Sequence, residues 1–144
     1  MRVMIVDDEL PIREWLQYSI QKTNLPMEVC ALCANGTEAL ETFQRLRPTL
    51  VFTDIKMPEK DGIELLQEIR RLDSQVYVVM LTSHDSFYYA RRSLKYQANE
   101  YILKSEITSQ SLARIYEAAE KQLRPAQGAA ARTGRASLPL REVV

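Results

Sequence analysis

Acidic, hydroxyl and ammonium side chains lie at the ends of four short apolar runs in this 144-residue sequence. Asp7 and Asp8 follow the first run, Asp54 the third, Thr82 the fourth, and Lys104 ends the fifth. If these groups meet, the carboxylates raise one another's pKa unless a cation lies among them, and Mg²⁺ is a suitable hard cation. A carboxylate can itself attack phosphorus and become an aspartyl phosphate. A metal, a lysine and a hydroxyl would then stabilise the phosphoryl oxygens.

The elements that must position these groups are five β-like runs alternating with five helical patterns. The runs are nearly continuous in apolar and β-branched residues, which is typical of parallel strands covered on both faces; they span 2–6, 28–33, 50–53, 76–81 and 100–104. The alternation predicts an α/β fold, a doubly wound five-stranded parallel sheet with helices on both faces. Ligands bind at the carboxyl ends of the strands in such sheets. The chemical groups should therefore converge on one edge.

Each of these residues taken singly has an ordinary structural interpretation. An Asp after a strand is commonly a turn former or a helix cap. Lys104 could be an exposed lysine, and Thr82 a cap or a buried hydroxyl. Four such residues at four strand ends are difficult to attribute to capping alone. The sequence has no Gly-rich phosphate loop, so a bound nucleotide is not expected.

Composition indicates a globular protein without a general affinity for nucleic acid or membranes. Lys plus Arg number 19 and Asp plus Glu number 19, so the chain has no overall charge to attract DNA or anionic lipid. No apolar run approaches the roughly 18–20 residues that span a bilayer. The N-terminal stretch reaches acidic residues too early for a signal peptide. We therefore expect a cytoplasmic protein.

Two cysteines form a C-x-x-C motif within a predicted strand, Cys30-Ala-Leu-Cys33. Residues three apart on a regular strand point to opposite faces and lie about 10 Å apart, beyond disulfide reach. Structural zinc needs four ligands, and the only histidine, His84, is distant in sequence. Reduced, buried thiols are the interpretation we favour over a redox or metal site.

The helical and strand periodicity ends near residue 123. Residues 124–144 are rich in Ala, Gly, Pro and Arg, which predicts a flexible tail, a linker stub or a cloning remnant. The folded domain is predicted to span residues 1–123.

Four segments of the sequence resemble a known family. "MIVDDE", "VFTDIKMPEKDGIELL", "VVMLTSHD" and "EYILK" occur in the order and at the spacing of response regulator receiver domains from two-component signalling. The D-x-x-M-P-x-x-D-G motif after an apolar strand is specific by itself. The resemblance covers residues 1–123 and implies a flavodoxin-like sheet with strand order 2-1-3-4-5.

The resemblance also implies a phosphoryl acceptor and a metal site. Asp54 would take the phosphoryl group from a sensor histidine kinase. Asp8 and Asp54 would bind Mg²⁺ (or Mn²⁺) with the backbone carbonyl of Lys56, and Asp7 would act through metal-bound water. The domain would be a phosphoacceptor switch with at most slow self-dephosphorylation, and not an enzyme.

A set of switch residues is implied in the same way. Thr82 would move toward the phosphoryl group, Lys104 would pair with it, and Tyr101 would rotate inward on activation. Gly62 would open the third helix. The family usually has proline after this lysine, and Ser105 at that position leaves the pose of Lys104 open.

Lys56 and His84 lie two residues after Asp54 and Thr82 respectively. In the family, side chains at such positions help or hinder the attacking water. The Lys56 side chain could shield or pair with the phosphoryl group. Both residues are equally well explained as exposed loop residues.

Residues 85–101 combine aromatic and basic side chains. The helical stripe Phe87, Ala90 and Leu94 is predicted to face the core. An interaction face is predicted from residues that cannot all be buried: Tyr88, Tyr89, Arg91, Arg92 and Tyr96. A solvated helix face is the alternative.

The stretch "LTSHDSFYYA" resembles regulators with an AraC-type DNA-binding domain, an effector absent from this chain. The implied partners are the kinase, that effector and a second copy of the domain on phosphorylation. Direct binding of nucleic acid or membrane by this domain is not implied.

Three other kinds of protein share parts of this pattern. A haloacid-dehalogenase-type phosphatase would have a second Asp where this chain has Lys56. A flavodoxin-like electron carrier would need a Ser/Thr/Gly-rich loop in place of Asp7-Asp8-Glu9. A pseudo-receiver that only binds partners stays open until phosphorylation is tested.

Overall fold

A five-stranded sheet forms the centre of the molecule. The computed structural model describes residues 1–133, with side chains to residue 124. All strands are parallel, in the order β2-β1-β3-β4-β5. The strands are β1 (Arg2–Val6), β2 (Glu28–Cys33), β3 (Leu50–Asp54), β4 (Tyr77–Thr82) and β5 (Glu100–Leu103). The predicted fold and strand order are confirmed.

The central strands explain why these runs lack polar alternation. Every residue of β3 and β4 is buried, since helices cover both faces of the sheet. The edge strand β5 is half-buried throughout. Asp54 and Thr82 are the last residues of β3 and β4, so two polar side chains lie at the end of the most buried strands.

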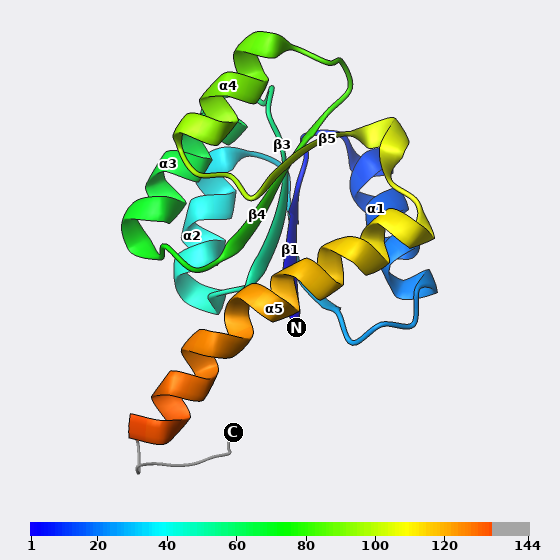
Figure 1. Ribbon diagram of the computed structural model, residues 1–144. Helices are drawn as coiled ribbons and strands as arrows, with labels where there is room; N and C mark the ends of the chain where they lie inside the picture. The colour runs from blue at the N-terminus through cyan, green and yellow to red at the C-terminus, as the bar shows by residue number, and fades with distance from the viewer. Residues whose placement is uncertain (134–144) are drawn as a thin grey trace.

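Helices cover the two faces of the sheet unequally (Figure 1). α1 (Leu10–Lys22) and α5 (Ser109–Thr133) pack on one face, while α2 (Gly36–Leu46), α3 (Gly62–Leu72) and α4 (Phe87–Lys95) lie on the other. A short 3₁₀ helix, η1 (Lys104–Glu106), joins β5 to α5. The helices therefore lie on both faces, as the alternating pattern predicts.

Two apolar clusters correspond to these two layers. Phe43 of α2 and Leu66 of α3 pack with Met80 against one face. Leu16 of α1 and Ile115 of α5 pack with Phe52 against the other. These side chains are fully buried, so their burial provides the main favourable free energy of the fold.

The predicted core face of α4 is wrong. Phe87 is 77% exposed and Leu94 is 69% exposed. The helix instead turns Tyr89, Ser93 and Tyr96 toward the sheet, with both tyrosines packed on the cluster and Ser93 buried. This set, like the predicted stripe, has spacings of three and four residues, which place its members on one face of a helix. A serine at its centre concealed the inner face from a pattern based on hydrophobicity.

The thiols also differ in part from their predicted environment. Both cysteines are free, and Cys33 is buried whereas Cys30 is half-buried. The β1–β2 register shifts so that Val29 pairs with Val3 but Ala31 pairs with Met4, leaving Cys30 as the extra residue. The regular alternation assumed for this strand is therefore broken at Cys30.

The last helix passes the predicted domain boundary. α5 continues past residue 123 to Thr133. The remainder of the predicted tail, 134–144, lies outside the described residues. No helix in the described part of the chain is both long and apolar enough to span a membrane.

Candidate functional site

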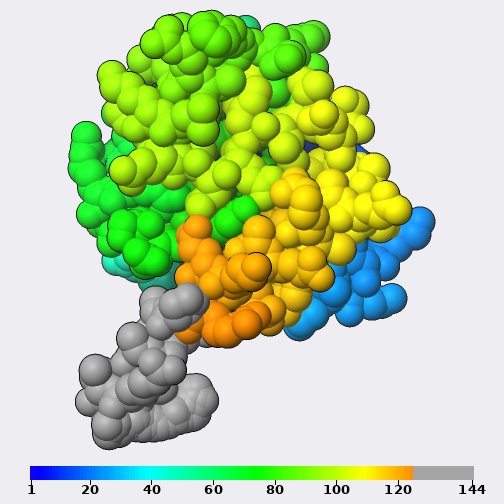
Figure 2. All heavy atoms as spheres, in the orientation of Figure 1, coloured from blue at the N-terminus to red at the C-terminus, as the bar shows by residue number. Residues whose placement is uncertain are grey.

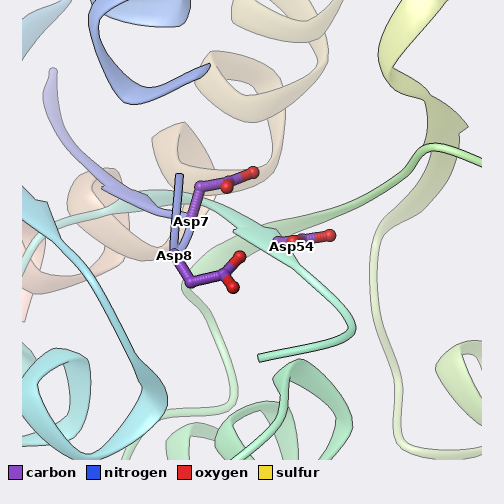
Figure 3. Close-up of side chains that lie close together, drawn as sticks. All are labelled: Asp7, Asp8 and Asp54. Carbon is purple, nitrogen blue, oxygen red and sulfur yellow. The ribbon is translucent and has the colours of Figure 1, made fainter. Parts of the chain in front are cut away.

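Three carboxylates meet at the carboxyl edge of the sheet. Asp7 and Asp8 follow β1, and Asp54 ends β3 on the neighbouring strand. One oxygen from each lies within 4.8 Å of the others. Figure 3 shows the three side chains directed to the same side of this edge. The predicted convergence of the acids is therefore present.

Local contacts fix the position of Asp54. Its carboxylate accepts a hydrogen bond from the backbone N–H of Ile55 at 2.9 Å. The N–H of Gly62 donates to the Ile55 carbonyl at 2.7 Å, which holds the start of α3 against the strand end. A Cβ at Gly62 would lie 2.1 Å from the Asp54 carbonyl oxygen. Only glycine permits this close approach.

A capping box holds the first turn of α3 in the same place. The Asp61 carboxylate accepts from the Glu64 N–H at 2.8 Å, and the Glu64 carboxylate accepts from the Asp61 N–H at 2.9 Å. The capping box thus fixes the C-terminal end of the loop that carries Lys56.

Lys104 reaches the acids from the end of β5. Its ammonium lies 2.8 Å from Asp7 Oδ2 and 3.5 Å from Asp54 Oδ1. The side chain is only 11% exposed. Ser105 in place of proline therefore does not prevent Lys104 from reaching the site.

The site is electrostatically strained by its excess of carboxylates. Burial, and secondly the nearby Asp7 carboxylate, raise the pKa of Asp54 to about 6, although Lys104 opposes the shift. Burial disfavours the charged form of Lys104, but Asp7 and Asp54 together raise its pKa above the usual value. One ammonium does not neutralise three acids.

The donor set fits a hard divalent cation. Asp7 Oδ2 is buried, and the contact described for it is the ion pair with the Lys104 ammonium at 2.8 Å. Asp8 is exposed and can still turn its oxygens toward an incoming ion. Clustered carboxylate oxygens with free lone pairs are the ligands that Mg²⁺ prefers.

The predicted switch hydroxyls are engaged with the loop after β4. Thr82 donates to the His84 carbonyl at 2.8 Å and accepts from the His84 N–H at 3.3 Å. Tyr101 accepts from the Ser86 N–H at 3.1 Å and donates to the Ser86 carbonyl at 3.3 Å. Ser86 is the N-cap of α4, so β5 is tied directly to the start of that helix.

A pocket of about 480 Å³ opens above Asp54 and includes Lys56, Thr82, His84 and Lys104 in its lining. Sequence reasoning did not place Ser86 and Tyr89 in it. The Lys56 ammonium lies over the Tyr89 ring, 5.8 Å from its centroid. The sequence offered one sign of this arrangement, an N-cap serine followed three residues later by an aromatic residue. That spacing alone does not show which way the ring points.

Comparison with known proteins agrees with this geometry. Residues 3–116 match the response regulator receiver domain family. The chain belongs to this family. It is the receiver domain of a two-component response regulator.

The receiver has relatives among longer regulators. The transcriptional regulatory protein HptR of Staphylococcus aureus is 38% identical over 103 residues, covering 72% of this chain and 40% of HptR. An uncharacterised response regulatory protein of Yersinia pestis is 39% identical over 104 residues, covering 72% of this chain and 42% of that protein. The chain thus spans about two fifths of the length of these curated relatives.

Solved receiver structures share the fold. The REC domain of AraT, a response regulator from Geobacillus stearothermophilus, has a TM-score of 0.76 and 33% identity, covering 87% of this chain and 96% of that one. A receiver domain protein from Clostridium thermocellum has a TM-score of 0.77 and 26% identity, covering 87% and 98%.

The predicted interaction face of the receiver lies on α4. The atoms of this segment, drawn yellow-green, lie at the surface in Figure 2. Tyr88 is 62% exposed, and the Arg92 guanidinium stacks 5.6 Å from its ring centroid and 5.4 Å from that of Tyr96. Arg91 stacks on Phe87. Tyr89 differs from this group because it turns toward the Asp54 pocket.

Proposed function

We propose that Asp54 is the phosphoryl acceptor of this receiver. A carboxylate oxygen of Asp54 attacks the phosphorus of a phosphohistidine on a sensor kinase. The new P–O bond forms as the P–N bond breaks, and the histidine nitrogen leaves with the bonding electrons. The observation that carries the proposal is the grouping of Asp54 with Asp7 and Asp8 within 4.8 Å, beside the Lys104 ammonium.

The neighbouring residues have supporting roles in this reaction. Asp8, Asp54 and the Lys56 carbonyl would hold Mg²⁺ (or Mn²⁺), and Asp7 would contact it through water. When bound, the cation neutralises phosphoryl charge. Lys104, whose ammonium lies 3.5 Å from Asp54 Oδ1, would orient and neutralise a phosphoryl oxygen. Lys56 and His84 line the pocket and tune how easily water reaches the phosphorus.

The conformational output runs through Thr82 and Tyr101. A phosphoryl oxygen attracts the Thr82 hydroxyl away from the His84 carbonyl. The loop after β4 then loses one of its anchors, and the Tyr101 bonds to Ser86 at the start of α4 are disturbed. This shifts the population of α4 arrangements, so the α4 surface reports the state of Asp54.

The wider role is supported by family membership and by relatives such as HptR, which is named a transcriptional regulatory protein. The receiver is proposed to act in the cytoplasm as a switch and not as an enzyme, with slow self-dephosphorylation. Its partners would be a sensor histidine kinase, a DNA-binding effector and a second phosphorylated copy. Residues 1–123 would form the phosphoacceptor domain.

Phosphorylation by a small donor tests the proposal directly. The protein is incubated with Mg²⁺ and acetyl phosphate and weighed intact beside Asp54→Asn. Asp85→Asn, in the exposed loop after β4, is the matched control. The expected result is a gain of one phosphate by the wild type and Asp85→Asn, and none by Asp54→Asn. No gain by any protein would favour the pseudo-receiver alternative.

A further inference from the structure

Lys56 and Tyr89 connect the acceptor loop with α4 beside the Asp54 pocket. Lys56 follows β3, whereas Tyr89 belongs to the first turn of α4. Both line the pocket that contains Asp54, and the ammonium of one lies over the ring of the other at 5.8 Å. This distance is within the range of a cation–π interaction.

The Tyr89 ring is held in place independently of Lys56. Its backbone N–H donates to the Ser86 hydroxyl at 3.3 Å, which fixes its turn of the helix. The ring packs against the cluster beneath α4 and meets Tyr88 edge-to-face, with centroids 5.4 Å apart. The contacts of the Tyr89 ring with the cluster and with Tyr88 do not involve Lys56, so the long lysine side chain adapts to the position of the ring.

Lys56 is available for such a contact. Within the part of the chain whose side chains are described, no carboxylate lies within 4.0 Å of its ammonium. Asp8 and Asp54 line the same pocket but do not pair with it. The contact described for this ammonium is the one with the tyrosine ring.

We propose that Tyr89 is a positioning residue that holds Lys56 across the mouth of the pocket and so prolongs the lifetime of the phosphoryl group on Asp54. The inference rests on the proposed function. In hydrolysis, water attacks the phosphorus on the side opposite the Asp54 oxygen and loses a proton to solvent. The bond between phosphorus and the Asp54 oxygen breaks, which releases phosphate and regenerates the carboxylate. A lysine stretched from the acceptor loop to α4 narrows the approach of this water.

Phosphate lifetime in matched variants tests the role of the ring. Each protein is phosphorylated with acetyl phosphate and Mg²⁺, the donor is removed by desalting, and the phosphorylated fraction is followed by intact mass. Tyr89→Leu keeps an apolar side chain on the core cluster but removes the ring. We expect its phosphoryl lifetime to fall by about two- to fivefold, the factor that corresponds to a partly exposed cation–π contact.

The controls separate the contact from general packing. Tyr89→Phe keeps the ring and should retain the wild-type lifetime. Tyr18→Leu removes another exposed cation–π pair, with Lys22 on α1, and should also leave it unchanged. Lys56→Met should shorten it as Tyr89→Leu does, and the double variant should be no shorter than Lys56→Met alone. Additive effects in the double variant, or an unchanged Tyr89→Leu lifetime, would overturn the inference.

A spectroscopic measurement reports the contact even if a variant is destabilised. Ring currents should shift the Lys56 Hε resonances upfield in the unphosphorylated wild type and in Tyr89→Phe, and not in Tyr89→Leu. Equal Lys56 shifts in all three would contradict the contact. If the wild type gained no phosphate at all, the proposed function itself would fail, and the inference would be withdrawn with it.

Discussion

Two helices on the same face of the sheet flank Asp54, and they are built differently. α3 buries Gly62, Ile63, Leu65, Leu66 and Ile69 and begins with a complete capping box. α4 buries only Ser93, whose hydroxyl has no hydrogen-bond partner in the described part of the molecule, while Phe87 and Leu94 are largely exposed. Both helices border the acceptor through their first turns.

This contrast suits the two helices to different roles: α3 positions the acceptor, and α4 responds to its state. The α3 side fixes the acceptor strand through Gly62 and a dense core, so it can position a phosphoryl group with little reorganisation. The α4 side is held by the partly buried rings of Tyr89 and Tyr96 and by polar contacts of Ser86, Thr82 and Tyr101. Regions with few buried apolar contacts open at the lowest free energy, so α4 is the element that a small change at Asp54 can shift.

Truncating one leucine on each helix tests whether α3 is more firmly packed than α4. Leu66→Ala on α3 should lower the free energy of unfolding by about 2–5 kcal/mol, because it leaves a cavity at a fully buried position. Leu94→Ala on α4 should change it by less than about 0.5 kcal/mol, since that side chain is already in solvent. Urea unfolding measures both. Similar losses for the two variants would show that α4 is as firmly packed as α3.

Magnesium should stabilise the acceptor side specifically. At 100 times its Kd the cation should raise the free energy of unfolding by about 2.7 kcal/mol, because it binds the folded acid cluster and not the unfolded chain. Asp8→Asn should weaken this response. Unfolding is compared in MgCl₂ and in NaCl of equal ionic strength. Equal stabilisation by the two salts would indicate screening instead of a bound cation.

Removing the acceptor charge should stabilise the metal-free protein. The pKa of Asp54 is raised to about 6 in the folded state. Between the ordinary pKa of aspartate and that value, the folded state holds a proton that the unfolded state has released, so the free energy of unfolding falls as the pH rises through this range. Asp54→Asn should gain about 1–2 kcal/mol at pH 8, less than the whole shift implies because the site is open at one side.

The pH dependence tests this explanation. The advantage of Asp54→Asn over the wild type should disappear at pH values below the ordinary pKa of aspartate, where both folded and unfolded carboxyls are protonated. Denaturant unfolding with EDTA across this range measures it. A constant difference at all pH values would exclude charge as the cause.

The smallest expected effect concerns the inner face of α4. Ser93→Ala should raise the free energy of unfolding by about 1 kcal/mol, because a buried hydroxyl without a partner is removed and alanine favours the helix. Ser19→Ala in the half-buried face of α1 measures the helix-propensity part alone. A loss of stability in Ser93→Ala would mean that the hydroxyl is satisfied in solution and that α4 is better anchored than proposed.

Some features of the site were predictable because they depend on single elements. The apolar runs predicted five parallel strands, and the residues that follow them predicted which edge carries the acids. The family resemblance then supplied the strand order. Asp54 and Gly62 could be placed because the D-x-x-M-P-x-x-D-G motif lies within one strand, one turn and one helix start.

The predicted core face of α4 was wrong because hydrophobic periodicity does not fix the rotation of a short helix that has aromatic residues on two faces. Phe87 and Tyr89 are both at suitable spacing for an inner face, and only packing against α3 and β5 selects Tyr89. The irregularity at Cys30 likewise arises from pairing with β1, so β2 alone gives no sign of it.

The sequence by itself determined the alternation of strands and helices, because a buried parallel strand consists of a nearly continuous run of apolar residues. That alternation also fixes the edge of the sheet at which the acids, Thr82 and Lys104 gather. The tertiary structure decided the 2.8 Å contact of Lys104 with Asp7, the phase of α4 and the placement of Lys56 over Tyr89. These depend on how separate elements pack together, and packing selects among side-chain directions that local sequence leaves equally favourable.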